Sequence, residues 1–306
     1  MMTAPVVMAP AHLVVAVTPD RSNVGPVAWA AREAVRRRAR LVVTALPPTD
    51  SRGSGFRRAM GAALAEGLDL ARELEPGLEV RIDHAGSAGY RHVVGLSEQA
   101  DLLVLATAAD EPQQPLPAAP LPERLAVHAG CPVVVLSPVA VQAGTGGHRI
   151  VVGWDRGRSG RHALDVAASE AASRSAWLTV VSVPPPVDPE VERTLGAPDH
   201  ESGLLAAIAE VERAHPRLVV DLLHRKGPVG TELIKAAQGA ELLVVGCHHS
   251  EQPWSNRPGA VAGSLLRTAP CPLMLVGAAG PPHRPHPVAE PVRTRATPHT
   301  TPAEPS

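Results

Sequence analysis

The sequence predicts an α/β protein made of two doubly wound domains in tandem, each with a five-stranded parallel sheet. The first observation behind this prediction is a repeat, in which an alanine-rich helical segment and the apolar run after it occur twice with the same gap. These segments are 29–34 with 39–43, and 166–171 with 176–180. The second observation is an apolar run followed downstream by Cys-Pro, also twice and with identical spacing. These are 101–105 with Cys131-Pro132, and 241–245 with Cys271-Pro272. The repeat indicates a domain duplication.

The expected elements follow the same order in both copies. The first copy should contain a strand at 13–17, a helix around 29–34, a strand at 41–45, a helix at 57–74, a third strand, a further helix, a strand at 101–105, a last helix and a strand at 131–136. The second copy should contain the corresponding strands at 150–154, 178–183, 241–245 and 271–276, with helices around 166–171 and at 204–214. Because the strands are apolar on both faces and alternate with helices, they predict a parallel sheet covered on both sides. Such sheets bind ligands at the carboxyl ends of their strands.

Changes in composition along the chain predict its domain boundaries. We expect one domain at 1–140, a Gly-rich linker at 141–147, a second domain at 148–277, and a disordered tail rich in Pro, Thr, His and Arg at 278–306. The last strand of each domain is apolar and would leave an open sheet edge if the domain stood alone. We therefore expect the two domains to pair face to face within the chain around a pseudo-two-fold axis. A homodimer is an alternative that the sequence leaves open.

The composition also excludes several classes of partner. The formal net charge is -1 and aromatic residues make up 2% of the chain, so neither a basic field nor stacking platforms favour nucleic acid. The arginines at 36–38 are interpreted as a solvated helix face.

No apolar run reaches the roughly twenty residues of a membrane span. The N-terminus has no basic region ahead of its apolar residues, and Cys131, Cys247 and Cys271 are odd in number, so we expect a cytoplasmic protein with buried, reduced thiols.

Both repeats resemble universal stress protein domains, and together they resemble the tandem form common in actinobacteria. The resemblance covers residues 11–276 and is carried by four segments of the second repeat. These are the strand end at 152–155, the helix at 167–171, the strand end at 243–246 and the segment 269–272 before the last strand. The resemblance implies a Rossmann-like fold and a regulatory role that responds to ATP or another adenine nucleotide and acts through an unidentified protein partner.

The resemblance also implies where the phosphates of a nucleotide would lie. ATP-binding members of the family carry a Gly, a second Gly three residues on, and, after nine more residues, a Gly followed by Ser or Thr. In the second repeat these positions hold Gly246, His249, Gly259 and Ala260, so two of the four match. Glycines let a loop fold tightly around phosphate oxygens, and backbone amides at a helix N-terminus bind them. We therefore expect a weakened phosphate site.

The nucleoside end of the site is better kept in the second repeat than in the first. Asp155 matches the aspartate that contacts the nucleotide in the family, and Val183 falls where the family lines the adenine pocket. The alternative interpretation of Asp155 is a turn residue after a strand. The first repeat has lost more of the family's residues than the second, and no nucleotide site is expected there. Its residues at these positions are Thr18, Ala106, Ala109, Ala119 and Pro120.

Several alternatives remain open at this stage. A gapped alignment would use Gly263-Ser264 as the phosphate pair, at the cost of about one turn of the final helix. The run Cys247-His248-His249 could suggest zinc, but no second spaced pair of ligands completes a site, so we expect no metal. Cys247 could also be an exposed, reactive thiol. No catalytic motif is present, so we expect no enzyme and no catalytic residue, with a weak ATPase activity as the alternative. A scaffold that acts without nucleotide is the alternative function.

Overall fold

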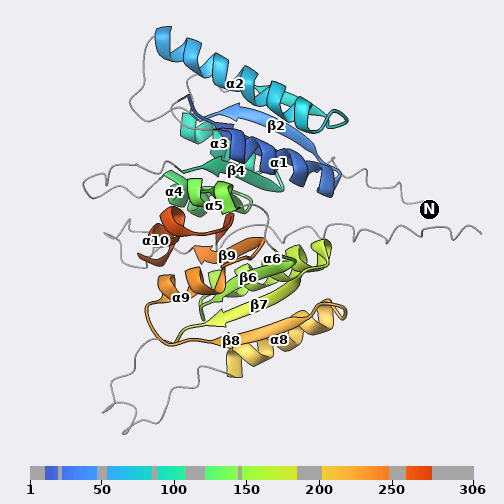
Figure 1. Cartoon of the computed structure of the whole chain (residues 1–306), viewed down its shortest axis with the longest axis vertical. Coiled ribbons are helices and arrows are strands. Elements are labelled where there is room, and N and C mark those ends of the chain that lie inside the picture. Colours follow the sequence, from blue (N-terminus) through green and yellow to red (C-terminus); the bar gives the residue numbers. More distant parts are fainter. Residues whose placement is uncertain are drawn as a thin grey trace, which may run out of the picture.

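Figure 1 shows the fold as a computed structural model, which describes residues 11–19, 23–46, 54–84, 89–107, 121–143, 147–184, 202–247 and 260–277. The first half, residues 11–143, contains β1 (His12–Val17), α1 (Val24–Arg37), β2 (Arg40–Ala45), α2 (Ser54–Leu74), β3 (Val80–Asp83), α3 (Gly89–Ser97), β4 (Leu102–Ala106), α4 (Leu121–His128), β5 (Val133–Leu136) and α5 (Pro138–Ala143). The second half, residues 147–277, contains β6 (Arg149–Trp154), α6 (Arg158–Arg174), β7 (Trp177–Ser182), α8 (Ser202–Ala214), β8 (Val220–His224), α9 (Val229–Ala236), β9 (Leu242–Cys247), α10 (Ala260–Thr268) and β10 (Leu273–Gly277). Apart from α5, the described elements follow the same order in both halves, which confirms the predicted α/β fold with doubly wound halves.

The strands of both halves form one sheet. Within the described residues its order is β3-β2-β1-β4-β5-β10-β9-β6-β7-β8. Neighbouring strands are parallel inside each half, and the halves meet where β5 and β10 pair antiparallel, with Met274 opposite Val134. The last strands therefore cover each other, as expected. The prediction that the domains pair face to face was wrong, because the two five-stranded sheets join edge to edge and satisfy the backbone groups of both edge strands.

Helices cover both faces of the sheet. Along β1, Leu13, Val15 and Val17 point into the core on the face of α1, α2, α6 and α8. Val14 and Ala16 point to the opposite face, where α3, α4, α9 and α10 pack. Because both sides of each strand are buried, the strands read as continuous apolar runs in the sequence. Each of the two cores extends through both halves.

The two halves also match in local detail. Helices α1 and α6 each end on a residue in the left-handed conformation, Arg38 and Ser175, both with φ of 53°. Cys131 and Cys271 both lie buried just before the two strands that join the halves. Burial raises the pKa of both thiols, to about 12 for Cys271, so they stay protonated and unreactive.

Three further sequence predictions, on the linker, the tail and membrane spans, can be compared with the structure. The helix α5, which was not expected, follows β5 and continues into the segment predicted as a linker; its Val141 lies against Gly25 at the start of α1. The predicted tail at 278–306 lies outside the described residues. None of the helices in the described ranges combines the length and the apolar composition that a membrane crossing requires.

Candidate functional site

Asp155 lies at the carboxyl edge of the second half, directly after β6, and its side chain shapes the turn into α6. The Gly157 N–H donates to Oδ1 of Asp155 over 2.6 Å. A Cβ at Gly157 would lie 2.9 Å from the same oxygen, and a Cβ at Gly160 would collide with the Asp155 carbonyl oxygen. The two glycines therefore let the backbone close around this half-buried aspartate. Asp155 fills the turn role that the sequence left open, at the edge where doubly wound sheets bind ligands.

Gly246, near the end of β9, lies too close to the backbone of α6 for a side chain to fit. An added Cβ would lie 2.6 Å from the carbonyl carbon of Ser159 and 2.9 Å from the Gly160 nitrogen. These are backbone atoms in the first turn of α6, which cannot move aside as the end of a side chain can. Gly246 therefore lets the β9 strand end lie directly against the start of α6, next to the turn that Asp155 shapes.

Val183 lies beside Asp155. Strands β6 and β7 are neighbours with Trp154 opposite Ser182, so the next residues of the two strands, Asp155 and Val183, emerge together at the carboxyl edge. Val183 packs against the core on the α9 and α10 face, whereas Trp154 packs on the opposite face. The indole Nε1 of Trp154 is buried without a hydrogen-bond partner in the part of the chain that the structure describes. The structure thus brings together the two residues expected at the nucleoside end.

The residues expected at the phosphate end are only partly within the described structure. His249 and Gly259 lie outside the described residues. Ala260 is the first residue of α10, and Gly263 and Ser264 lie inside this helix. The ungapped register therefore puts its last position at the start of a helix, where backbone amides are open to an anion. The gapped alternative would put its phosphate pair within the helix.

The corresponding turn of the first half is closed by a side chain. Asn23 stands at the repeat position of Gly160, and its Oδ1 accepts from the Thr18 N–H over 3.1 Å while its Nδ2 donates to the Thr18 carbonyl over 2.7 Å. Thr18, the counterpart of Asp155, is 7% exposed, and its Oγ1 has no hydrogen-bond partner among the described residues. Ala106 ends β4, while the residues expected beyond it fall outside the described ranges. In the first half, the backbone N–H and carbonyl of Thr18 are therefore bonded to the Asn23 side chain within the turn.

The described residues contain no group of three or more His, Cys, Asp or Glu side chains placed to hold a metal ion. Cys247 is 7% exposed at the end of β9. The alternative of an exposed, reactive thiol at this position is therefore wrong, because burial keeps oxidants from the sulfur. His248 and His249, the other members of the candidate zinc run, lie outside the described residues.

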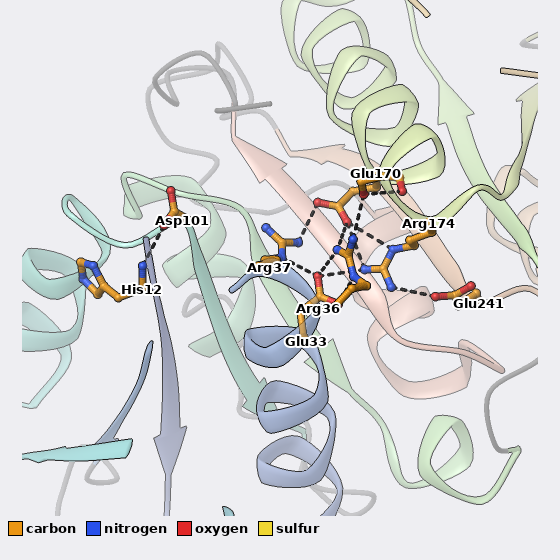
Figure 2. A network of polar contacts seen from close by, with 9 residues as sticks. His12, Glu33, Arg36, Arg37, Asp101, Glu170, Arg174 and Glu241 are labelled. Atoms are coloured by element: carbon orange, nitrogen blue, oxygen red, sulfur yellow. Dashed lines mark hydrogen bonds and ion pairs between the residues drawn. The ribbon is translucent and has the colours of Figure 1, made fainter. Parts of the chain in front are cut away.

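A buried ion-pair cluster between α1 and α6, which the sequence analysis did not anticipate, lies where the halves meet (Figure 2). Glu33 and Arg37 of α1 face Glu170 and Arg174 of α6, and none of these side chains is more than 6% exposed. Arg37 pairs with Glu33 at 2.5 Å and with Glu170 at 2.7 Å. Arg174 pairs with Glu170 at 3.0 Å and with Glu33 at 3.1 Å. Each arginine therefore bridges its own helix and the opposite one.

The electrostatics of this cluster keep its carboxylates charged. Burial alone would raise the pKa of Glu33, but the guanidiniums of Arg37 and Arg174 hold that pKa at about 2. The interpretation of residues 36–38 as a solvated face was wrong for two of the three arginines. Arg37 is buried and the Arg36 side chain is 25% exposed, because the helix face that carries them packs against α6. Arg38 is exposed.

Solved structures share this arrangement of elements. A universal stress protein from Archaeoglobus fulgidus DSM 4304 has a TM-score of 0.61 at 12% sequence identity, over 87% of this chain and 98% of that one. A putative universal stress protein from Pseudomonas aeruginosa UCBPP-PA14 has a TM-score of 0.52 at 18% identity, over 88% of this chain and 94% of that one. The protein thus has the two-part α/β fold found in these universal stress proteins, as the resemblance implied.

Sequence comparison gives the family. Residues 147–277 match the Universal stress protein family. The universal stress protein Rv2624c of Mycobacterium tuberculosis (strain ATCC 25618 / H37Rv) is 32% identical over 134 residues, which are 42% of this chain and 47% of that protein. The universal stress protein MT2699 of strain CDC 1551 / Oshkosh matches to the same extent. The chain spans about half the length of the curated relatives it matches. Residues 147–277 thus form a Universal stress protein family domain.

Proposed function

We propose that the second half binds an adenine nucleotide at the carboxyl edge of β6, β7 and β9, and that the first half does not. The observation that carries the proposal is the difference between two equivalent turns. In the second half Asp155 emerges beside Val183, next to the glycine-lined start of α6. In the first half the side chain of Asn23 fills the turn and uses both backbone groups of Thr18.

Binding in this proposal depends mainly on the nucleoside. Asp155 supplies a hydrogen-bond acceptor for hydroxyl or amino groups, and Val183 supplies an apolar surface for the base. At the phosphate end, Ala260 offers a backbone amide at the start of α10 but no hydroxyl, and His249 replaces a glycine. ATP, ADP and AMP should therefore bind within about tenfold of one another, a difference of about 1.4 kcal/mol.

The role that fits such a site is regulation by occupancy, without turnover of the ligand. Phosphoryl transfer requires a metal ion held by a hydroxyl and a carboxylate, together with a cation on the transferred group. Ala260 has replaced the hydroxyl at the helix start where such an ion would be held, and the sequence contains no P-loop lysine motif. The chain would then report the nucleotide level to a partner protein.

The test begins with mass spectrometry of small molecules released from the purified, denatured chain. Calorimetric titration of the ligand-free chain with ATP, ADP and AMP then gives the three dissociation constants. We expect one site per chain and similar constants. A preference for ATP of about a hundredfold or more would contradict the nucleoside-dominated site. If no nucleotide binds and none co-purifies, the alternative of a scaffold that works through protein contacts alone replaces this proposal.

A further inference from the structure

The buried cluster between α1 and α6 joins residues that occupy the same positions in the two repeats. Glu33 and Arg37 are the counterparts of Glu170 and Arg174. Each arginine pairs once within its helix and once across to the other half. This part of the cluster is symmetric, because each contact from the first half to the second is returned from the second to the first. Two copies of either half would make these same four contacts, so they do not decide which halves pair.

A first departure from symmetry lies at Arg36. Its counterpart in the second half is Ser173, and Nη1 of Arg36 donates to the Ser173 Oγ over 2.9 Å. The Arg36 guanidinium also pairs with Glu33 and, at 3.2 Å, with Glu170 of the opposite half. The long side chain thus reaches across the pseudo-two-fold axis into room left by the short side chain of its own counterpart. In a pair of two first halves, two arginines would meet at this place.

A second departure from symmetry lies at Glu241, just before β9. Its carboxylate pairs with Nη1 of Arg174 at 2.7 Å. The counterpart in the first half is Asp101, whose carboxylate instead accepts from the backbone N–H of His12 over 2.9 Å and has no ion pair within the described residues. Figure 2 shows Asp101 and His12 apart from the cluster that contains Glu241.

The two departures make the halves complementary in charge. The first half contributes Glu33, Arg36 and Arg37 to the cluster, and the second half contributes Glu170, Arg174 and Glu241. One carboxylate with two guanidiniums gives the first half a net +1, and two carboxylates with one guanidinium give the second half a net -1. The unlike pair is neutral, whereas a pair of like halves would carry a charge of +2 or -2 in a mostly buried place. Unbalanced buried charge strongly disfavours an interface.

We propose that Arg36, Ser173 and Glu241 make this surface selective for unlike halves. Each half then accepts the opposite half of the chain and rejects a copy of itself on a second molecule. The selection is needed because the rest of the interface does not discriminate. Strands β5 and β10 are both short and apolar, and the four central charges are the same in both halves. Two such strands can pair with several partners and in several registers, unless neighbouring side chains disfavour the wrong pairings.

The first experiment tests whether Arg36 and Ser173 face each other, using hydrogen exchange of the full-length chain read by mass spectrometry. The variant Ser173→Arg puts a second guanidinium opposite Arg36, and we expect amides of β5 and β10 to exchange about tenfold faster or more. Adding Arg36→Ser to this variant moves the arginine to the other half and should restore slow exchange. The matched control is Ser175→Arg, which adds the same charge two residues further on, where the side chain is exposed and the counterpart is Arg38; it should leave exchange unchanged.

Two results of this experiment would overturn the proposal. Fast exchange that persists in the double variant would mean that the two side chains do not act as a pair. Unchanged exchange in Ser173→Arg would mean that the interface tolerates like charges. Rescue by the second substitution shows in addition that the fold accommodates an arginine at position 173, so the loss of exchange protection in the single variant comes from the two guanidiniums facing each other.

The second experiment tests the rejection of like halves. The variant Arg36→Ser with Glu241→Gln leaves only the four symmetric charges, so like and unlike pairs become equally neutral. When this chain is refolded at high protein concentration, sedimentation should show a dimer fraction several-fold above that of the wild type. Arg36→Lys, which keeps the charge, serves as the control and should behave as the wild type does. An equal dimer fraction in all three chains would refute the selection.

Discussion

Removal of the Glu170 carboxylate should destabilise the fold far more than removal of an exposed carboxylate. Glu170 is fully buried, and its carboxylate forms ion pairs with Arg37 at 2.7 Å, with Arg174 at 3.0 Å and with Arg36 at 3.2 Å. Glu170→Gln keeps the shape of the side chain but removes its charge. The three guanidiniums of the cluster are then balanced by only two carboxylates, those of Glu33 and Glu241. Breaking a buried ion pair in this way costs about 3–5 kcal/mol. This is a large part of the about 5–15 kcal/mol by which native domains are stable.

Urea denaturation followed by circular dichroism measures this loss, provided that the slope of the transition stays constant between variants. The matched control is Glu79→Gln. Glu79 pairs with Arg81 at 2.6 Å, a distance similar to those in the cluster, but these side chains are 56% and 65% exposed. Exposed pairs contribute about 1 kcal/mol or less. If Glu170→Gln costs no more than Glu79→Gln, water reaches the cluster, and the account of a buried network between α1 and α6 is wrong.

Three further predictions concern the site, the pH dependence and the packing of the second half. Asp155→Ala should weaken adenine nucleotide binding by about 1–3 kcal/mol, because a polar group of the ligand loses its partner, whereas Thr18→Ala should change nothing; equal losses in calorimetric titrations would contradict a single site. Because the pKa of Glu33 is about 2 in the folded protein and 4.5 ordinarily, its contribution to stability is complete above pH 4.5 and is lost as the pH falls toward 2. Urea midpoints at pH 6 and pH 3 should therefore differ more for the wild type than for Glu33→Gln, and equal differences would argue against the lowered pKa. Gly246→Ala should cost about 1–3 kcal/mol, since the new methyl group meets backbone atoms. Gly61→Ala, which meets nothing within 4 Å, should instead stabilise helix α2 by up to about 1 kcal/mol, and similar effects of the two alanines in thermal melts would count against the close contact.

The sequence was sufficient to predict the order of elements because both faces of each strand are buried. The apolar run at 13–17 corresponds to β1 (His12–Val17), and the run at 150–154 lies within β6 (Arg149–Trp154). The joining of the halves was predicted from the apolar last strands, but their edge-to-edge geometry was not. Apolar side chains indicate that a strand is buried, and they do not tell whether a sheet or a single strand covers it.

The ion-pair cluster was missed because a run of arginines is usually exposed, and the residues that bury this one are more than a hundred positions away. One signal was nevertheless present in the sequence. Glu33 and Arg37 recur as Glu170 and Arg174 at the same spacing of four residues, within the repeated helical segment. The pairing of Asp155 with Val183 follows from strand register alone. The phosphate loop has no periodic pattern from which its geometry could be derived.

The place of β10 in the sheet has a consequence for the synthesis of the chain. Among the described residues it is the last strand along the chain, yet it lies in the middle of the sheet and covers the free edge of β5. A ribosome finishes β5 about 140 residues before it finishes β10, which at about 5–20 residues per second is an interval on the order of ten seconds. During that interval the first half has an apolar strand edge without its partner. The newly made chain therefore passes through a stage that is prone to aggregation, which the finished protein no longer shows.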